Sequence, residues 1–157
     1  MTRAENILEF FWGARSRIRS IKEPDKTEKR YDGEIKVNTH GTPVNGSSNQ
    51  GTIRITYDNL VKAFGVPKKG REVNHKIGVE WDLDFKVGKK KISVNIYDWK
   101  QNKEYVKSIR GEEEGEEGLD PQDITLWEVG GKYPESLHIV TAYFRQSGVE
   151  YKKISYL

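Results

Sequence analysis

The chain has 157 residues, 34% of them hydrophobic and 32% charged, with a net charge of +3 at pH 7. This length suits a single domain with its own core. The absence of cysteine excludes disulfides, thiolate metal ligands and cysteine nucleophiles. No apolar run approaches the roughly 18 residues that a membrane span needs, and the first residues lack the apolar core of a signal peptide. We therefore expect a soluble, cytoplasmic protein with no membrane partner.

The net charge hides an uneven distribution. Residues 111–120 (GEEEGEEGLD) carry five Glu and one Asp and no basic residue, so removing these six negative charges from the net +3 leaves +9 for the rest of the chain. A basic body of this kind fits a polyanionic partner such as a nucleotide or nucleic acid. It is equally compatible with an ordinary soluble domain.

Residues 1–21 predict an N-terminal amphipathic helix. Its apolar residues recur at helical spacing, and they are Ala4, Ile7, Leu8, Phe11, Ala14, Ile18 and Ile21. The second half has a basic flank of Arg15, Arg17, Arg19 and Lys22, which are candidates for contact with nucleic acid or a partner protein; alternatively they are solvated. Residues 22–51 are rich in Gly, Ser, Asn, Thr and Pro and predict a flexible linker with a short strand near 34–37.

The folded domain is predicted at residues 52–157. Residues 53–55 alternate as a strand, Thr56 or Asp58 can cap a short helix that carries Phe64, and Gly65 ends it. Residues 79–87 (VEWDLDFKV) alternate apolar and polar side chains as a half-buried strand does. After a GKK turn, residues 92–97 alternate in the same way and complete an antiparallel hairpin.

The remaining elements follow a predicted exposed, acidic loop at 111–120. Residues 123–129 predict a further strand, residues 134–147 a helix that Gly148 ends, and residues 149–156 a last strand with a bulge. The predicted fold class is α+β: a curved antiparallel sheet of about four to five strands with helices on one face, in addition to the N-terminal helix.

Residues for catalysis are few. His40, His75 and His138 form no pair at metal-ligand spacing, and no serine lies in a nucleophile elbow. We expect no catalytic residue, no metal and no cofactor, and hence a protein that is not an enzyme.

One set of carboxylates leaves an alternative open. Glu80, Asp82 and Asp84 share one face of the predicted strand and could together bind Mg²⁺, as in carboxylate-dependent nucleases. We favour the simpler interpretation, in which they form the outward polar face of that strand.

Aromatic and basic residues alternate just after the predicted hairpin. The candidate ligand-binding residues there are Tyr97, Asp98, Trp99, Lys100 and Lys103. Aromatic rings beside ammonium groups suit stacking on a base while a phosphate is neutralised. The competing interpretation is that the tryptophan completes the core and the lysines are solvated.

Residues 126–137 (LWEVGGKYPESL) pass from a strand through two glycines and a lysine into a helix. Such a helix N-terminus can bind a phosphate. However, Pro134 lacks one of the amides, Tyr133 is a poor N-cap, and the long glycine loop of a P-loop is missing. We favour a simple turn here. Trp127, Gly130, Gly131 and Lys132 are then candidates for one wall of a binding surface, with residues 97–100 as the other wall.

Four segments, ITYDNLVKAFGVP, VEWDLDF, VNIYDWK and ITLWEVGGK, occur in an order that resembles a small accessory domain found in phages and other viruses. The resemblance covers about residues 51–147. This chain departs from that domain in two places. Glu128 stands where the domain commonly has histidine, and the acidic insertion lies where the domain's own stretch is often short.

The resemblance implies a viral accessory protein. We therefore expect a non-enzymatic protein that antagonises host antiviral defence in the host cytoplasm, by binding a defence protein or by sequestering a nucleotide signal. The alternative from the residues themselves is a nucleic-acid-binding protein that uses the Arg-rich N-terminal helix. Uncovered sheet edges and the apolar stripe of that helix also predict a homodimer.

Overall fold

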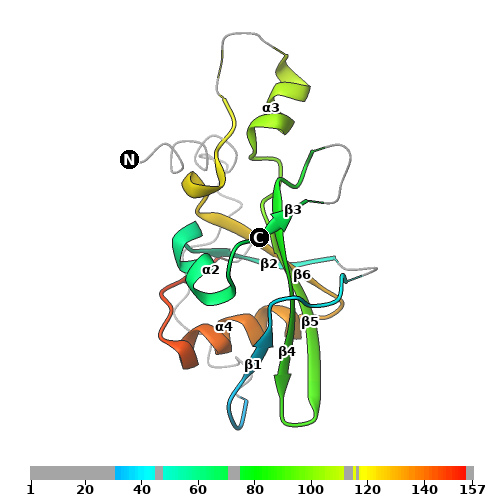
Figure 1. Ribbon diagram of the computed structural model, residues 1–157, viewed down its shortest axis with the longest axis vertical. Coiled ribbons are helices and arrows are strands. Elements are labelled where there is room, and N and C mark those ends of the chain that lie inside the picture. Colours follow the sequence, from blue (N-terminus) through cyan, green and yellow to red (C-terminus); the bar gives the residue numbers. More distant parts are fainter. Residues whose placement is uncertain (1–30, 45–47, 71–74, 112–114, 116, 155–157) are drawn as a thin grey trace.

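An antiparallel sheet organises the protein (Figure 1). The computed structural model describes residues 31–44, 48–70, 75–111, 115 and 117–154. The strand order is β1-β4-β5-β6-β2-β7, and β3 also pairs with β4. The strands are β1 (Lys36–Asn38), β2 (Ser48–Arg54), β3 (Lys68–Lys69), β4 (Val79–Val87), β5 (Lys90–Tyr97), β6 (Leu126–Gly131) and β7 (Lys152–Ile154).

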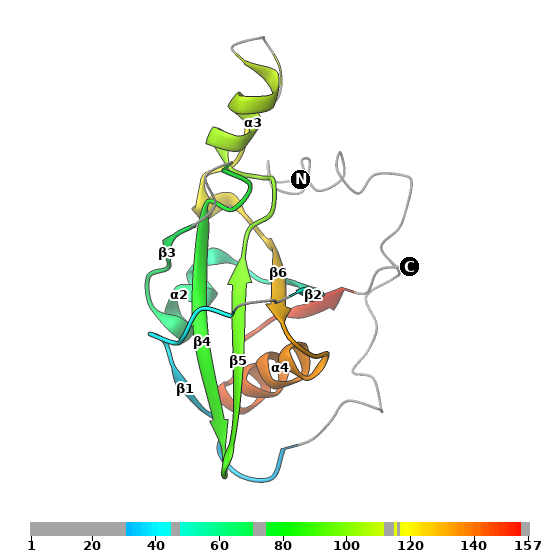
Figure 2. The ribbon, with the colours of Figure 1, turned by 90° about the vertical axis from the view of Figure 1, so that its right-hand side faces the viewer.

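Two helices, α2 (Tyr57–Phe64) and α4 (Glu135–Ser147), cover one face of this sheet. Figure 2 shows both on the far side of the β4–β5 hairpin. The third helix, α3 (Lys103–Arg110), projects beyond the end of the sheet, and a short 3₁₀ helix, η1 (Pro121–Asp123), leads into β6. None of the described helices is long and apolar enough to cross a membrane.

The α+β class and the antiparallel hairpin are confirmed. On β4, Trp81, Leu83 and Phe85 point to the helices and are at most 2% exposed, as the alternation predicts. On β5, Val94 and Ile96 lie on the same face with no exposure. The short strand expected near residues 34–37 is β1 and the last expected strand contains β7, whereas the two-residue β3 is too short for an alternation pattern to reveal it.

Both core helices have the expected boundaries. The Thr56 side chain accepts a hydrogen bond from the Asn59 amide and caps α2, and Gly65 ends that helix at φ 80°. Gly148 ends α4 in the left-handed region, which favours glycine. The two helices meet at Phe64 and Phe144, whose ring centroids are 5.6 Å apart.

The sheet begins earlier than the expected domain boundary near Thr52. Within the segment predicted as a linker, β1 pairs with β4 and β2 begins at Ser48. Ile35 is only 3% exposed, and its amide donates to Gln146 Oε1 on α4 at 2.8 Å. An apolar residue followed by a three-residue edge strand joins the core without giving a periodic sequence signal.

The acidic segment is not exposed along its whole length. Leu119 is 1% exposed, and its amide donates to the Gln101 carbonyl oxygen at 2.7 Å. The preceding helix α3 is not among the predicted elements, and Asn102 caps it by accepting from the Tyr105 amide. Residues 112–114 and 116, and the whole predicted N-terminal helix 1–21, lie outside the described residues.

Candidate anion-binding site

The pairing of β5 with β6 brings part of the two predicted walls together and separates the rest: the Tyr97 ring lies beside Gly130, whereas Trp99 and Lys132 lie towards different ends of the paired strands. Tyr97 lies opposite Glu128 and Asn95 opposite Gly130, and the strands are antiparallel. β6 therefore ends near the beginning of β5, while the Trp99 turn follows the other end of β5. Lys132 consequently lies with the lysines at the β4–β5 turn and not with Lys100.

Two of the sequence candidates have structural roles. The Trp127 side chain has no exposure, and its Nε1 donates to the Ile55 carbonyl oxygen at 3.1 Å. Asp98 is equally buried, and its Oδ1 accepts from the backbone amides of Gly78 (2.9 Å) and Val79 (2.8 Å). Burial raises the pKa of the Asp98 carboxyl, although those amides act in the opposite direction. Neither residue is placed to touch a ligand.

Trp99 does remain at the surface, with 37% of its area exposed. The Nζ atoms of Lys76 and Lys100 lie 5.7 Å and 5.5 Å from its ring centroid, and the Tyr97 ring is 6.3 Å away. Lys103 instead pairs with Asp120 at 3.2 Å. The aromatic part of the prediction thus forms one exposed cluster at this end of the sheet.

A cavity of about 480 Å³ lies at the opposite end, beside the start of α4. We call it the α4 pocket. Its basic residues are Lys90 and Lys91 at the start of β5 and Lys132 just after β6. Lys132 was a sequence candidate, whereas Lys90 and Lys91 were not. Predicting that they line this cavity would have required the β5–β6 register, because that register brings together residues about 40 positions apart in the sequence.

The first turn of α4 adds partial positive charge to this pocket. α4 has 13 residues, and no side chain caps its N-terminus, where Pro134 is the N-cap residue. A helix of this length carries a partial positive charge at that end. The turn residue Tyr133 and the first-turn residue Ser136 both line the cavity.

Ser136 is the second polar group that favours an anion here. It is 2% exposed, and its hydroxyl makes no hydrogen bond with any residue that the structure describes. Ser136 Oγ is not one of the fully buried polar atoms that lack a partner among the described residues, so the oxygen is accessible from the cavity. Gly131 allows this position: a Cβ there would lie 1.9 Å from Ser136 Oγ. A ligand oxygen in the pocket can accept a hydrogen bond from this hydroxyl.

Two of the three lysines form ion pairs with carboxylates. Lys90 pairs with Glu135 Oε1, which also accepts from the Tyr31 hydroxyl at 3.2 Å. Burial, and then the Glu135 charge, raise the pKa of Tyr31, so this phenol stays a neutral donor. Lys91 Nζ lies 3.4 Å from Asp84 Oδ2. The Lys90 and Lys91 side chains are about half exposed, and solvent screens a pair whose ammonium group is this accessible, so an entering anion can compete for both ammonium groups.

Asp84 also fixes the wall of the pocket. Its Oδ1 accepts from Ser93 Oγ at 2.7 Å, and its Oδ2 accepts from the Thr42 amide at 3.3 Å. These bonds attach the segment that carries Thr42, Pro43 and Val44 to the sheet. The described ionic groups around the cavity are three ammonium groups and two carboxylates, so the pocket has a positive excess.

The strand carboxylates differ from the outward, solvated face that was expected. Glu80, Asp82 and Asp84 do lie on the sheet face opposite the helices, but they are only 2%, 4% and 8% exposed. Alternation predicts which face a side chain takes, and it does not predict what covers that face. Among the described residues, no group of three His, Asp or Glu side chains is arranged to bind a metal ion.

The arginine-rich candidates Arg15, Arg17, Arg19 and Lys22 lie outside the described residues. The nucleic-acid alternative and the homodimer that depend on this segment stay predictions. No protein family matches the chain, and neither a curated protein nor a solved structure matches it. What the geometry shows is a cavity at the N-terminus of α4 that three lysines line.

Proposed function

We propose that this protein is a non-enzymatic binding protein that captures a nucleotide by its phosphate in the α4 pocket. The observation that carries the proposal is the position of Ser136, which lies in the first turn of α4, where no side chain caps the helix, within a cavity that three lysines line. Ammonium groups, a hydroxyl and a helix N-terminus are the groups with which proteins bind phosphate.

The other half of the pocket suits a base. Pro43, Val44 and Ile92 supply apolar surface, and Tyr133 is 68% exposed beside them. An exposed tyrosine ring next to a phosphate site can stack on a nucleobase. The volume of about 480 Å³ also fits the range of small-molecule sites. Inorganic phosphate alone would leave this half empty.

The resemblance to viral accessory domains supports a biological setting for the proposal. A viral protein that holds a nucleotide without consuming it would act by sequestration, which lowers the free concentration of a host defence signal in the host cytoplasm. Binding a defence protein directly is the other route to the same outcome. The α4 pocket favours the nucleotide route, because its chemistry suits a small anion.

Isothermal titration calorimetry on the full chain tests this proposal. The panel contains mononucleotides, cyclic dinucleotides and cyclic oligonucleotides, with the matched nucleosides and inorganic phosphate as controls. At least one nucleotide should bind more tightly than its nucleoside and more tightly than phosphate. If every nucleotide fails to bind, or if nucleosides bind equally well, the α4 pocket is not a nucleotide site.

A further inference from the structure

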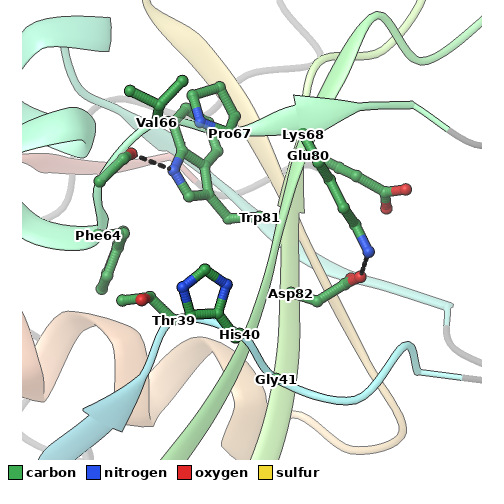
Figure 3. A pocket seen from close by; sticks show the side chains of 11 residues that line it. Thr39, His40, Gly41, Phe64, Val66, Pro67, Lys68, Glu80, Trp81 and Asp82 are labelled. Carbon is green, nitrogen blue, oxygen red and sulfur yellow. Dashed lines mark hydrogen bonds and ion pairs between the residues drawn. The ribbon is translucent and has the colours of Figure 1, made fainter.

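The three tryptophans that the structure describes divide into two core residues and one surface residue. Trp81 and Trp127 are at most 2% exposed, and their indole N–H groups donate to the carbonyl oxygens of Gly65 at 2.8 Å and Ile55 at 3.1 Å. Figure 3 shows the Trp81 ring held in this way in the wall of a cavity of about 530 Å³. Trp99 differs in both respects, because it is 37% exposed and its indole N–H has no hydrogen-bond partner among the described residues.

The chain holds Trp99 in place from both sides. The preceding carboxylate, Asp98, accepts hydrogen bonds at 2.9 Å and 2.8 Å from two backbone amides at the start of β4. The following residue, Lys100, donates its amide to the Lys76 carbonyl oxygen at 2.7 Å. A surface that is ordered before a ligand arrives loses little conformational freedom on binding.

Two residues with unfavourable backbone conformations flank this part of the surface. His75 and Lys100 are the non-glycine residues with positive φ in the described part of the chain, at 61° and 58°. Such strain is often found where a protein fixes the residues of a binding site. The Nζ atoms of Lys76 and Lys100 lie 5.7 Å and 5.5 Å from the Trp99 ring centroid. We call Tyr97, Trp99, Lys76 and Lys100 the Trp99 cluster.

The ammonium group of Lys100 is available to an anion. Within the described ranges it forms no ion pair, and its side chain interacts only with the Trp99 ring. The neighbouring carboxylates of Glu104 and Asp120 each contact a basic side chain already, at 2.9 Å and 3.2 Å. An incoming phosphate therefore does not have to break an ion pair at Lys100.

The acidic segment is partly remote from this cluster. Its described residue Gly115 lies beside Arg110, in the last turn of α3. That turn is about 10 Å along the helix from its first residue, which exceeds the screening length of about 8 Å at physiological salt. Repulsion of an anion from this position is consequently weak at the Trp99 cluster.

We infer that the Trp99 cluster binds single-stranded nucleic acid, with a base stacked on the indole and the adjoining phosphate at Lys100. An exposed contact between an ammonium group and a ring shifts an equilibrium only about two- to fivefold, whereas a base stacked on an aromatic side chain contributes about fivefold to a hundredfold. A base can therefore displace an ammonium group from the ring, and that group then neutralises a phosphate. The site lies at the opposite end of β5 from the α4 pocket and takes a polymer in place of a small anion.

Fluorescence anisotropy of the full chain with a labelled oligothymidylate tests the inference. The matched probe is an abasic oligonucleotide of the same length, which keeps the phosphates and lacks the bases, and a duplex of that length is the second control. We expect the oligothymidylate to bind about tenfold more tightly than the abasic probe. An oligouridylate distinguishes RNA from DNA as the natural source, and tighter binding than the abasic probe by either supports the inference.

Two substitutions of Trp99 locate the contact. Trp99→Ala should weaken oligothymidylate binding about tenfold and leave the affinities for the abasic probe and the duplex unchanged. Trp99→Phe keeps a ring on which a base can stack and should bind within about threefold of the wild type. In NMR spectra of the ¹⁵N-labelled chain, the Trp99 indole signal, identified by its loss in Trp99→Phe, should shift saturably with the oligothymidylate, whereas the signal of the buried Trp127 indole should not.

Lys100→Asn separates the charge from the backbone conformation. Asparagine tolerates left-handed backbone, so the melting temperature should stay at the wild-type value. The slope of log K against log salt should become shallower by about 0.7, the value for one phosphate contact on a single strand. Lys89→Asn, at an exposed lysine in the β4–β5 turn, is the matched control and should change neither quantity.

Several outcomes would overturn the inference. One is no binding of either single-stranded probe, and another is equal affinity for the oligothymidylate and the abasic probe. Unchanged oligothymidylate binding in Trp99→Ala would place the contact elsewhere on the chain. Trp99→Ala should still bind a nucleotide as the wild type does, so failure of this inference is distinguishable from failure of the α4 pocket.

Discussion

Gly131 and Ser136 fit together so closely that a Cβ at position 131 would lie 1.9 Å from Ser136 Oγ and 2.5 Å from Ser136 Cβ. The end of β6 and the first turn of α4 are therefore in direct contact. Because no φ between +20° and +160° is recorded for Gly131, the requirement for glycine is steric. The second glycine of the LWEVGGK segment thus seats the hydroxyl at the floor of the α4 pocket.

Gly131→Ala should displace the first turn of α4. The free energy of unfolding, measured by urea denaturation, should fall by about 1–3 kcal/mol, as for other overpacked sites. Gly115→Ala is the matched control, because the nearest atom to its Cβ would be Arg110 Nη1 at 3.5 Å, an ordinary contact. In a Ser136→Gly background the cost of Gly131→Ala should shrink. An equal cost in both backgrounds would contradict the proposed contact.

Substitutions at the charged residues of the α4 pocket should change nucleotide affinity in opposite directions. Lys132→Ala should weaken binding about tenfold, which corresponds to ~1.4 kcal/mol, because among the described residues Lys132 has no carboxylate partner. Glu135→Gln should tighten binding, since it frees Lys90 from its ion pair.

Calorimetry at two salt concentrations checks both charge effects, because screening weakens a phosphate–lysine contact. Lys62→Ala, an exposed lysine on α2, is the control and should bind as the wild type does. Equal losses for Lys62→Ala and Lys132→Ala would indicate a general charge effect and not a pocket.

Trp99 and Trp127 should differ sharply in their effect on stability. Trp127→Phe leaves the buried carbonyl oxygen of Ile55 without its donor, and we expect a loss of about 1–3 kcal/mol in the free energy of unfolding. Trp99→Phe keeps an aromatic ring at an exposed position and should change stability by less than about 0.5 kcal/mol. Thermal and urea unfolding of both variants measure this difference. Similar losses would mean that Trp99 also supports the core.

Asp98 should make stability depend on pH. Its carboxyl has a pKa above the ordinary 3.8 in the folded protein, so the folded state binds this proton more tightly than the unfolded state does. The resulting stabilisation is fully present below the unfolded pKa and is lost as pH rises through the folded pKa.

The comparison with Asp98→Asn isolates that contribution. The stability advantage of the wild type over Asp98→Asn should be greatest below about pH 4 and should decline as the pH rises. Urea denaturation from acid to neutral pH provides the measurement. An advantage that grows with pH would show that the amides of Gly78 and Val79 dominate and lower the pKa instead.

The elements that could be predicted from the sequence are the long amphipathic ones. The β4–β5 hairpin alternates over its whole length, and α2 has both a side-chain cap and a terminal glycine. The missed elements are short or polar: β3 has two residues, and half of the α3 residues are charged, with only Val106 buried. Such segments depend on tertiary pairing and not on periodicity.

The candidate site could be predicted only in part, for a different reason. Lys132 and the two glycines are neighbours in the sequence, so they suggest a phosphate-binding turn without any knowledge of the fold. Lys90 and Lys91 join them only through the β5–β6 register, which local patterns do not fix. The same register places Tyr97 beside Gly130 but puts the Trp99 turn at the other end of β5 from Lys132, so the two motifs adjoin only in part.

The most direct test of the nucleotide site is a titration of the ¹⁵N-labelled full chain with a nucleoside monophosphate and with its matched nucleoside, followed by NMR. We expect saturable shifts of the Thr42, Lys132 and Ser136 amides with the nucleotide, and much weaker shifts with the nucleoside. Shifts of equal size with both compounds, shifts confined to the Trp99 turn, or no shifts at all would contradict the assignment of the α4 pocket as a phosphate-binding site.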